Sequence, residues 1–389
     1  MPGGNTQHRA VPYWRLSGFY LFYFASLGAL IPYWSLYLKS LGFEPRDIGT
    51  LMALVMATKI VSPNIWGWVA DHTGRRMFIV RAGCGLAALC FIGVFLGDGY
   101  WWLALVMIAF SFFWNATLPQ FEATTLNYLG DHSHRYSGIR LWGSIGFIVA
   151  ASALGPLLDL QGAGILPVVL LVLLSGIWLS SLAVPEQATQ YLPLDHEPLR
   201  KVLARPEVVA LLVVCFLLQA SHGPYYTFYT LYLEGYGYSR SFIGQLWALG
   251  VIAEVGVFLV MHRLVPRFGL RRLLLASLLL TALRWVLIGQ FPEILPVVVF
   301  AQTLHAASFG IYHAVAIQLI HRYFTGRHQG KGQALYSSLS FGAGGAVGSY
   351  FSGLAWTGIG ADMTYFVAAG AALLAAAVTW LWIRPAENH

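Results

Sequence analysis

The chain has 389 residues, of which 58% are hydrophobic and only 10% are charged. Soluble domains carry charge on about 25% of their residues, so this composition excludes a protein whose main solvent is water. The formal net charge of +7 leaves two explanations open, a nucleic-acid partner or membrane topology, and the positions of the cations distinguish them.

Apolar stretches of about 18 to 25 residues recur along the whole chain, and each could cross a hydrocarbon core of about 30 Å as a helix. Backbone groups inside lipid must hydrogen-bond within their own segment, which favours helices over barrel strands here. The first stretch is too long for a signal peptide and has no small-residue cleavage site. The sequence therefore predicts an all-α membrane protein with twelve transmembrane helices, over 13–38, 47–70, 78–97, 101–128, 139–159, 164–184, 207–233, 242–262, 272–291, 294–320, 332–357 and 362–383.

The lysines and arginines lie almost entirely on one side of these spans. If the N-terminus is cytoplasmic, 17 of the 23 fall on cytoplasmic segments. The loops outside hold Lys39, Arg46 and Arg240. The positive-inside rule therefore predicts that both termini are cytoplasmic, and topology accounts for the net charge without a nucleic-acid partner.

The two halves of the chain repeat each other at an offset of 195 residues. Leu36-Tyr37-Leu38 recurs as Leu231-Tyr232-Leu233, and Ile48-Gly49 recurs as Ile243-Gly244. The match continues from the first span into the loop after the second. Each half is therefore expected to contain six helices.

The segment between the halves is polar and contains Pro185, Pro193 and Pro198. We expect an N-terminal six-helix bundle over 1–184, a cytoplasmic linker over 185–206 and a C-terminal six-helix bundle over 207–389. An even number of helices gives the halves the same orientation, which is typical of transporters that rock around a central site. Transport is therefore the predicted activity.

The loop after the second span reads Gly67-Trp68-Val69-Ala70-Asp71-His72-Thr73-Gly74-Arg75-Arg76. It resembles the signature loop of the major facilitator superfamily, G-x-x-x-D-x-x-G-R-[KR], and Gly67, Asp71, Gly74, Arg75 and Arg76 occupy its defining positions. Glycines permit a tight turn and close helix approach, and Asp71 can cap a helix or pair with a cation. The resemblance implies two pseudo-symmetric six-helix bundles and a role for this loop in conformational change.

Three further segments resemble the bacterial phenylpropionic acid permeases, and the similarity covers nearly the whole chain. They begin at Ile139, Leu218 and Leu249. Because those permeases are related to the nucleoside and lactose proton symporters, the resemblance implies a proton-driven symporter of the bacterial inner membrane. The implied substrate is 3-phenylpropionate or another small aromatic acid, and a nucleoside or sugar is the alternative.

Glu122 and Arg140 lie equally far from the middle of the hairpin that joins the fourth and fifth spans. Antiparallel packing would bring them to similar depth, where they could form an ion pair, and Asn115 shares the Glu122 face. The lactose permease has a similar acid and arginine, which implies that Arg140 binds substrate with Glu122 as its partner. In the alternative interpretation Arg140 reaches toward the cytoplasmic surface and Glu122 only closes the hairpin.

Lys59 and Glu254 occupy equivalent repeat positions with opposite charge. Symmetry would place them across a central cavity, and Glu254 could there gain and lose a proton. The alternative is a static salt bridge between helices.

Arg284, His305 and His313 form a third candidate group for proton coupling. The lactose permease also has an arginine and a histidine on its ninth and tenth helices, but its additional glutamate on the tenth has no counterpart here. Glu254 is therefore the favoured proton carrier. His305, Phe309 and Tyr312 are expected on one helical face, with His313 adjoining, although a histidine can also serve only in packing.

Aromatic and polar side chains on the first and seventh spans are candidates for substrate contact. Gln219, His222, Tyr226 and Tyr229 follow helical spacing, and Tyr23 and Trp34 could stack on an aromatic ring. The same stripe would suit a nucleoside or a sugar.

Two other classes of protein are disfavoured. A membrane-embedded enzyme lacks support because no metal-ligand spacing, nucleophile–base set or phosphate loop is present, and no cofactor is expected. A channel is disfavoured because a two-fold repeat of dissimilar helices is typical of a carrier. The expected partners are a small-molecule substrate, a proton and the lipid bilayer, with the chain acting as a monomer.

Overall fold

The computed structural model describes residues 11–186, 199–325 and 328–383. Within these ranges the chain is helical and contains no strand. The first half consists of α1 (Tyr13–Ser40), α2 (Pro45–Thr73), α3 (Arg76–Phe91), η1 (Ile92–Phe95), α4 (Tyr100–Leu129), η2 (Gly130–Arg135), α5 (Tyr136–Gln161), η3 (Ala163–Ile165) and α6 (Leu166–Leu182).

The second half is less regular. It consists of α7 (Leu199–Leu203), α8 (Pro206–Ser221), α9 (Gly223–Gly235), α10 (Arg240–Phe268), α11 (Leu270–Gln290), α12 (Leu295–Thr303), η4 (Ala306–Ile311), α13 (Tyr312–Tyr323), α14 (His328–Ser337), η5 (Ser338–Gly344), α15 (Gly345–Gly358) and α16 (Ala361–Trp382). The segments η4 and η5 are wound as π-helices.

The predicted all-α membrane fold is confirmed. In the described part of the chain, 11 helices are long and apolar enough to span a membrane. The predicted eleventh span is also helical, as the continuous run α14–η5–α15, but its serines and glycines make it less apolar than the others. This run packs against α2 and α8, where protein rather than lipid surrounds much of it.

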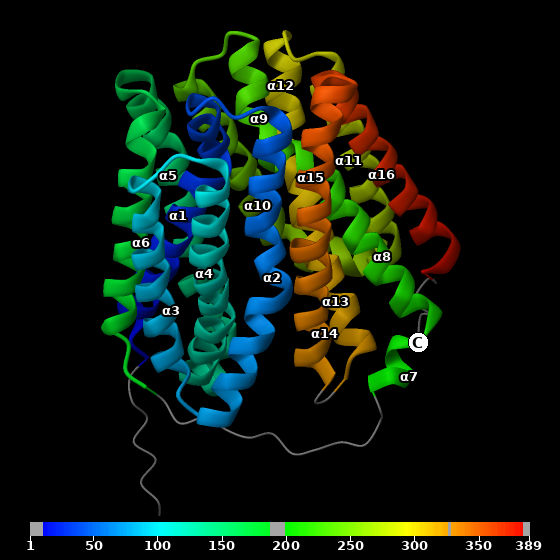
Figure 1. The fold of residues 1–389 in the computed structure, drawn as a ribbon. Coiled ribbons are helices and arrows are strands. Elements are labelled where there is room, and N and C mark those ends of the chain that lie inside the picture. The colour runs from blue at the N-terminus through cyan, green and yellow to red at the C-terminus, as the bar shows by residue number, and fades with distance from the viewer. Residues whose placement is uncertain (1–10, 187–198, 326–327, 384–389) are drawn as a thin grey trace, which may run out of the picture.

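The helices form two bundles side by side (Figure 1). In the first, α1 packs on both α5 and α6, and α4 packs on both α2 and α3. In the second, α16 packs on α8 and α11. The bundles meet along two helix pairs, α5 with α10 and α2 with α15. The predicted linker lies largely in 187–198, outside the described residues, and the predicted domain boundaries stay a prediction.

The bundles are joined tightly at one end, here called the gate end, where α1, α5 and α9 finish and α2 and α10 begin. Two repeat-related glycines permit the close approach. A Cβ at Gly49 would lie 2.7 Å from the Cα of Gly353, and a Cβ at Gly244 would collide with the Ala151 carbonyl oxygen. Side chains at these positions would hold the bundles apart.

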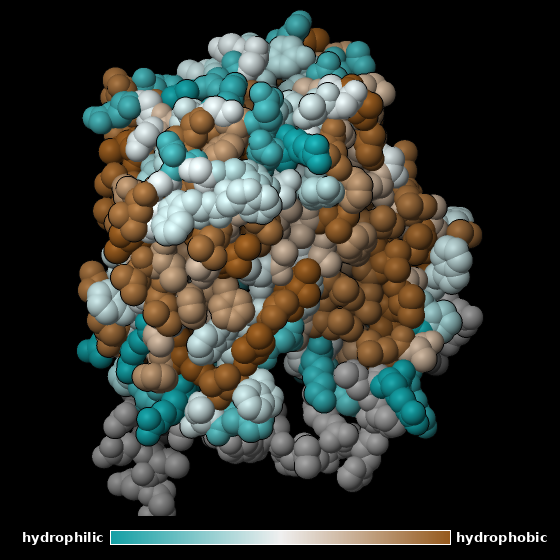
Figure 2. Space-filling model, in the orientation of Figure 1, coloured by the Kyte–Doolittle hydropathy of each residue, from teal (hydrophilic) through white to brown (hydrophobic). Residues whose placement is uncertain are grey.

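At the opposite end of the molecule the two bundles part. Figure 2 shows the surface hollowed between them at the lower edge of the view, with hydrophilic residues around the opening. Brown, hydrophobic surface covers most of the rest of this face. The structure is therefore closed at the gate end, and on this face a hollow separates the two halves at the other end.

Candidate functional site

Arg140 is held on α5 with its guanidinium unpaired. Its Cζ lies 3.7 Å from the centre of the Phe24 ring and 5.9 Å from that of Tyr20. A Cβ at Gly143 would lie 2.6 Å from its Nη1, so the glycine provides room for the side chain. The described residues give Arg140 neither a hydrogen bond nor an ion pair. Its N–H donors are therefore available to a ligand.

The direct ion pair expected between Glu122 and Arg140 is not formed. The Tyr136 hydroxyl instead donates to Oε1 of Glu122 at 3.2 Å. Arg140 lies over Phe24, while its charge still acts on the Glu122 carboxylate over a longer distance. Glu122 therefore contributes to the charge around Arg140 without occupying its hydrogen-bond donors.

Asn115 links two helices of the N-terminal bundle. Its amide donates to Thr58 Oγ1 at 2.8 Å and to the Val55 carbonyl at 3.2 Å, so both amide hydrogens are used in holding α4 against α2. A contact with substrate would have to use its carbonyl oxygen. The predicted binding role stays a prediction, and this structure gives Asn115 a packing role.

The two aromatic residues predicted on α1 are both enclosed. Tyr23 stacks on Trp114 at 5.0 Å, and Trp34 is fully buried, with its indole N–H 3.5 Å from the Met107 sulfur. Trp34 also lies against Phe91 of α3. Trp34 therefore belongs to the core of the N-terminal bundle in this conformation, because its ring is turned toward α3 and α4.

The pairing of Lys59 with Glu254 across the interface is not observed. A Cβ at Gly342 would lie 3.3 Å from the Lys59 carbonyl carbon, which places Lys59 beside η5. No acidic partner for its ammonium group occurs among the described contacts. Glu254 is paired within its own bundle, so the two repeat-related residues have different surroundings.

Arg284 is the centre of a buried polar network in the C-terminal bundle. Its side chain is fully buried, and Nη1 contacts His305 Nδ1 at 3.0 Å and donates to Ser308 Oγ at 2.8 Å. Nη2 donates to Gln302 Oε1 at 2.8 Å, and the Gln302 amide donates to the Tyr225 hydroxyl at 2.8 Å. The network joins α11 to α12, η4 and α9.

The network continues to Glu254 on α10. Oε2 of Glu254 lies 3.5 Å from His305 Nε2. Because an arginine can only donate, the Nδ1 of His305 that faces Arg284 must accept, which assigns the imidazole hydrogen to Nε2, toward Glu254. Glu254, His305 and Arg284 thus lie in a row, with the imidazole between the carboxylate and the guanidinium.

The π-helical segment η4 changes which side chains share a face. His305, Phe309 and His313 form a stack of nearly parallel rings, with successive centroids 5.6 Å apart and planes 10° apart. A π-helix makes i→i+5 hydrogen bonds and so places residues four apart nearly in line. Tyr312, expected on this face, is instead fully buried and hydrogen-bonded to Ser340.

The polar stripe of the seventh span lies inside the C-terminal bundle. His222 is fully buried, its Nδ1 is 2.8 Å from the Leu218 carbonyl oxygen, and its ring stacks on Tyr226. The helix is interrupted here because Pro224 has no N–H for the preceding turn. Nε2 of His222, the amide nitrogen of Gln219 and the hydroxyl of Tyr229 are buried without a partner among the described residues.

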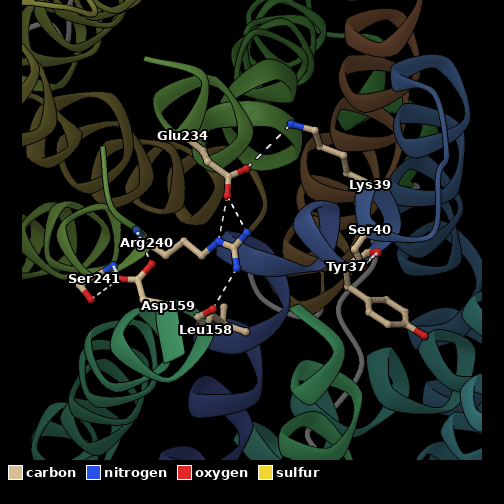
Figure 3. Close-up of polar contacts among 8 residues, drawn as sticks. All are labelled: Tyr37, Lys39, Ser40, Leu158, Asp159, Glu234, Arg240 and Ser241. Carbon is tan, nitrogen blue, oxygen red and sulfur yellow. Dashed lines mark hydrogen bonds and ion pairs between the residues drawn. The ribbon is translucent and has the colours of Figure 1, made fainter. Parts of the chain in front are cut away.

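An ion-pair cluster closes the gate end (Figure 3). Glu234 of α9 accepts from Arg240 Nε at 2.9 Å and pairs with its Nη2 at 2.7 Å. Lys39 of α1 lies 3.9 Å from Glu234, and Nη1 of Arg240 donates to the Leu158 carbonyl of α5 at 2.9 Å. Two cations that the sequence places in outside loops therefore join the two halves.

Asp159 strengthens the same closure from α5. Its carboxylate accepts from the backbone N–H groups of Arg240 at 3.1 Å and Ser241 at 2.9 Å, and from the Ser241 hydroxyl (Figure 3). These N–H groups begin α10 and have no partner within the helix, so a carboxylate there is favourable. Sequence reasoning missed Asp159 and Glu234, because no local pattern in the sequence indicates which distant residues lie opposite their carboxylates.

The signature loop forms a tight turn between α2 and α3. Gly74 adopts a φ of +65°, which an L side chain rarely adopts, and its N–H bonds to the Ala70 carbonyl. Asp71 pairs with Arg76 at 2.8 Å. The adjoining Arg75 is exposed.

The start of α3 is capped by a residue distant in sequence. The Glu186 carboxylate accepts from the backbone N–H groups of Met77 at 2.9 Å and Phe78 at 3.1 Å. Gly67, the first residue of the signature, lies against α4, since a Cβ there would be 3.5 Å from Gln120 Nε2. Of the two roles expected for Asp71, it pairs with a neighbouring cation, Arg76, while Glu186 caps α3.

Comparisons with known proteins agree with this architecture. The profile of the MFS_1 like family matches residues 13–367. The chain is 28% identical over 356 residues to a probable 3-phenylpropionic acid transporter of Escherichia coli, covering 90% of this chain and 92% of that protein. It is also 28% identical over 332 residues to a maltose permease of Geobacillus stearothermophilus, covering 84% and 83%.

The crystal structure of a mutant of the nucleoside transporter NupG has a similar fold. The TM-score is 0.83 at 16% sequence identity, and the similarity covers 96% of this chain and 100% of that one. The family match spans most of the chain, and the relatives are membrane transporters rather than enzymes. The chain belongs to the MFS_1-like family and is a multi-pass secondary transporter of the major facilitator superfamily.

Proposed function

We propose that the protein is a proton-coupled symporter of a small aromatic carboxylate such as 3-phenylpropionate in the bacterial inner membrane. The unpaired guanidinium of Arg140 carries the substrate part of this proposal. A planar guanidinium can bind a carboxylate through two parallel hydrogen bonds. The Phe24 and Tyr20 rings beside Arg140 offer apolar surface to the aryl group.

Proton coupling is supported by the position of Glu254. It is the acid closest to the buried Arg284–His305 pair, and the charge of Arg140 acts on it from the other bundle. Protonation would neutralise Glu254, and a bound carboxylate would neutralise Arg140. An uncompensated charge inside the membrane is costly. The two halves would therefore change conformation readily only when proton and substrate are both bound, or when both are absent and the charges of Glu254 and Arg140 balance each other.

Alternating access supplies the direction of movement. Given the cytoplasmic excess of lysine and arginine, the gate end would face outward and the opposite end would face the cytoplasm, with both termini inside. The present conformation is then the one that releases substrate inward. Uptake requires the gate end to part while the opposite end closes.

Symport of a nucleoside or sugar is the second candidate. The maltose permease and NupG similarities favour it, and the stripe of Gln219, His222 and Tyr226 could hydrogen-bond a polyol. Arg140 could donate hydrogen bonds to a neutral solute as well as to a carboxylate, so the two candidates are distinguished by which solute is taken up rather than by the need for Arg140.

The deciding experiment is uptake of radiolabelled 3-phenylpropionate into energised vesicles with and without a protonophore. Saturable uptake that the protonophore abolishes is expected. Absence of uptake by inserted, folded protein, together with uptake of maltose or a nucleoside, would replace the aromatic-acid proposal with the second candidate.

A further inference from the structure

Part of the Arg284 guanidinium has no hydrogen-bond partner among the described residues. The group has five N–H donors. His305 and Ser308 use those of Nη1, and Gln302 uses one of Nη2. The donors not engaged in these hydrogen bonds are one Nη2 hydrogen and Nε–H. Nε is buried and has no hydrogen-bond partner among the described residues.

Two buried tyrosine hydroxyls near Arg284 are in the same situation. Tyr229 of α9 is 1% exposed and Tyr365 of α16 is fully buried, and neither hydroxyl has a partner in the described part of the chain. Both interact electrostatically with Arg284. The three side chains lie at similar distances from the gate end, because each is four to six residues from the end of its helix there.

The ring contacts confirm that these groups are neighbours. The Tyr225 ring lies 4.2 Å from Arg284 Cζ and 4.9 Å from the Tyr229 ring. On the other side, the Trp285 ring lies 4.8 Å from the same Cζ and 6.3 Å from the Tyr365 ring. The Tyr229 and Tyr365 rings therefore each pack on a ring that contacts the buried cation.

The chemistry of this group suits an anion. Four hydrogens are available, two from Arg284 and one from each tyrosine, and no carboxylate contacts Arg284 directly among the described residues. Glu254 reaches it only through His305. A buried unsatisfied donor costs about 1 to 3 kcal/mol, and a single water would leave the positive charge in place. An anion would satisfy the donors and neutralise the charge.

We propose that the unpartnered Nε–H of Arg284, with the hydroxyls of Tyr229 and Tyr365, forms a buried binding site for a small monovalent anion inside the C-terminal bundle. The anion is either a free ion of halide size or the carboxylate of a transported acid. The site is separate from Arg140, and only its carboxylate alternative rests on the proposed function.

Thermal unfolding of the full-length protein in detergent tests the site. The midpoint is measured at constant ionic strength while a bulky sulfonate is replaced by chloride, acetate or 3-phenylpropionate. Binding to the folded state raises the midpoint saturably. Tyr229→Phe and Tyr365→Phe should each weaken the apparent affinity about tenfold or more, since each removes one hydrogen bond to a charge.

Tyr232→Phe is the matched control. Tyr232 is a buried tyrosine on the same helix as Tyr229, but its hydroxyl already donates to Asp362 at 2.6 Å. This variant should unfold earlier and yet keep the wild-type anion affinity. A cooperative melt is required of every variant, and either of the two test variants suffices if the other does not fold.

The outcomes separate the two sources of the anion. Stabilisation by chloride and acetate identifies a free-ion site, and stabilisation by 3-phenylpropionate alone identifies the carboxylate of the transported acid. Either result supports the site if the two tyrosine variants weaken it. No saturable shift, or an equal shift in wild type and both variants, would overturn it. Uptake assays are independent of this result, so the transport proposal can stand or fall separately.

Discussion

Arg140 and Arg284 differ in what surrounds their guanidinium groups. Arg284 is enclosed and makes three polar contacts through its Nη atoms. Arg140 lies against aromatic rings with its donors unpaired among the described residues. Arg284 therefore holds a network together through its Nη atoms and leaves Nε for the proposed anion, whereas Arg140 has its donors available to an entering substrate.

Replacing Arg140 by alanine should reduce uptake of the carboxylate substrate at least about tenfold at subsaturating concentration, because charge-assisted hydrogen bonds are worth roughly 1.5 to 3 kcal/mol. Arg140→Lys should be intermediate, since it keeps the charge but loses the bidentate geometry. Initial rates in vesicles measure both. Arg135→Ala, a nearby exposed arginine, is the control, and full uptake by Arg140→Ala would exclude carboxylate binding there.

Replacing Glu254 by glutamine should separate transport from proton coupling. Glutamine can still accept a hydrogen bond from His305 but cannot release a proton. We expect accumulation against a gradient to be lost and exchange of labelled for unlabelled substrate to persist. Glu293→Gln, at an exposed acid, should leave both activities unchanged. Accumulation of substrate against a gradient by Glu254→Gln would show that another residue carries the coupled proton.

At the scale of the helices, the gate end depends on small residues and on charge. Gly49 and Gly244 let the halves approach, and Asp159 contacts the start of α10. The two glycines are 195 residues apart because they occupy equivalent positions in the repeat. Each lies near the start of the helix that packs against the other half, α2 or α10. Lys39 and Glu234 are also 195 residues apart, so this ion pair joins repeat-equivalent positions of opposite charge.

Replacing Asp159 by asparagine should favour opening of the gate end. The variant loses the charge facing the first N–H groups of α10, and we expect a roughly threefold or greater rise in accessibility, modest because the site faces solvent. The background for the assay lacks Cys84, Cys90 and Cys215. A Ser152→Cys substitution then places a single cysteine between α5 and α10. Its rate of labelling with an impermeant maleimide reports the change in accessibility.

The control for this experiment is Asp98→Asn, which removes an exposed acid from a loop at the same end of the bundle. Its labelling rate should equal that of the single-cysteine protein with Asp98 and Asp159 intact. If Asp159→Asn also leaves the rate unchanged, the Asp159 contact does not limit opening.

At the scale of the whole molecule, charge balance determines the driving force. A monovalent carboxylate carried with one proton moves no net charge. Uptake should therefore persist when valinomycin and potassium collapse the membrane potential, and should stop when nigericin collapses the pH gradient. Sensitivity to valinomycin would instead indicate more than one proton per substrate. Flux measurements in the same vesicles with each ionophore distinguish the two.

The sequence by itself determined the membrane-spanning, all-α architecture, the repeat and the superfamily, because hydrophobic length and a tight glycine turn are local properties. It also identified Arg140, Glu254, Arg284 and His305 as polar residues inside spans. Gln302 is three residues before His305, and this helical spacing is the sequence signal for its place in the same network.

Only the tertiary structure decided which of these residues meet. Glu254 pairs with His305 rather than Lys59, Trp34 turns into its own bundle, and the π-helical turn replaces Tyr312 by His313 on the stacked face. Asp159 meets α10 from a distant helix. Partners across helices depend on crossing angles and on the conformation of the two halves, which no local pattern in the chain specifies.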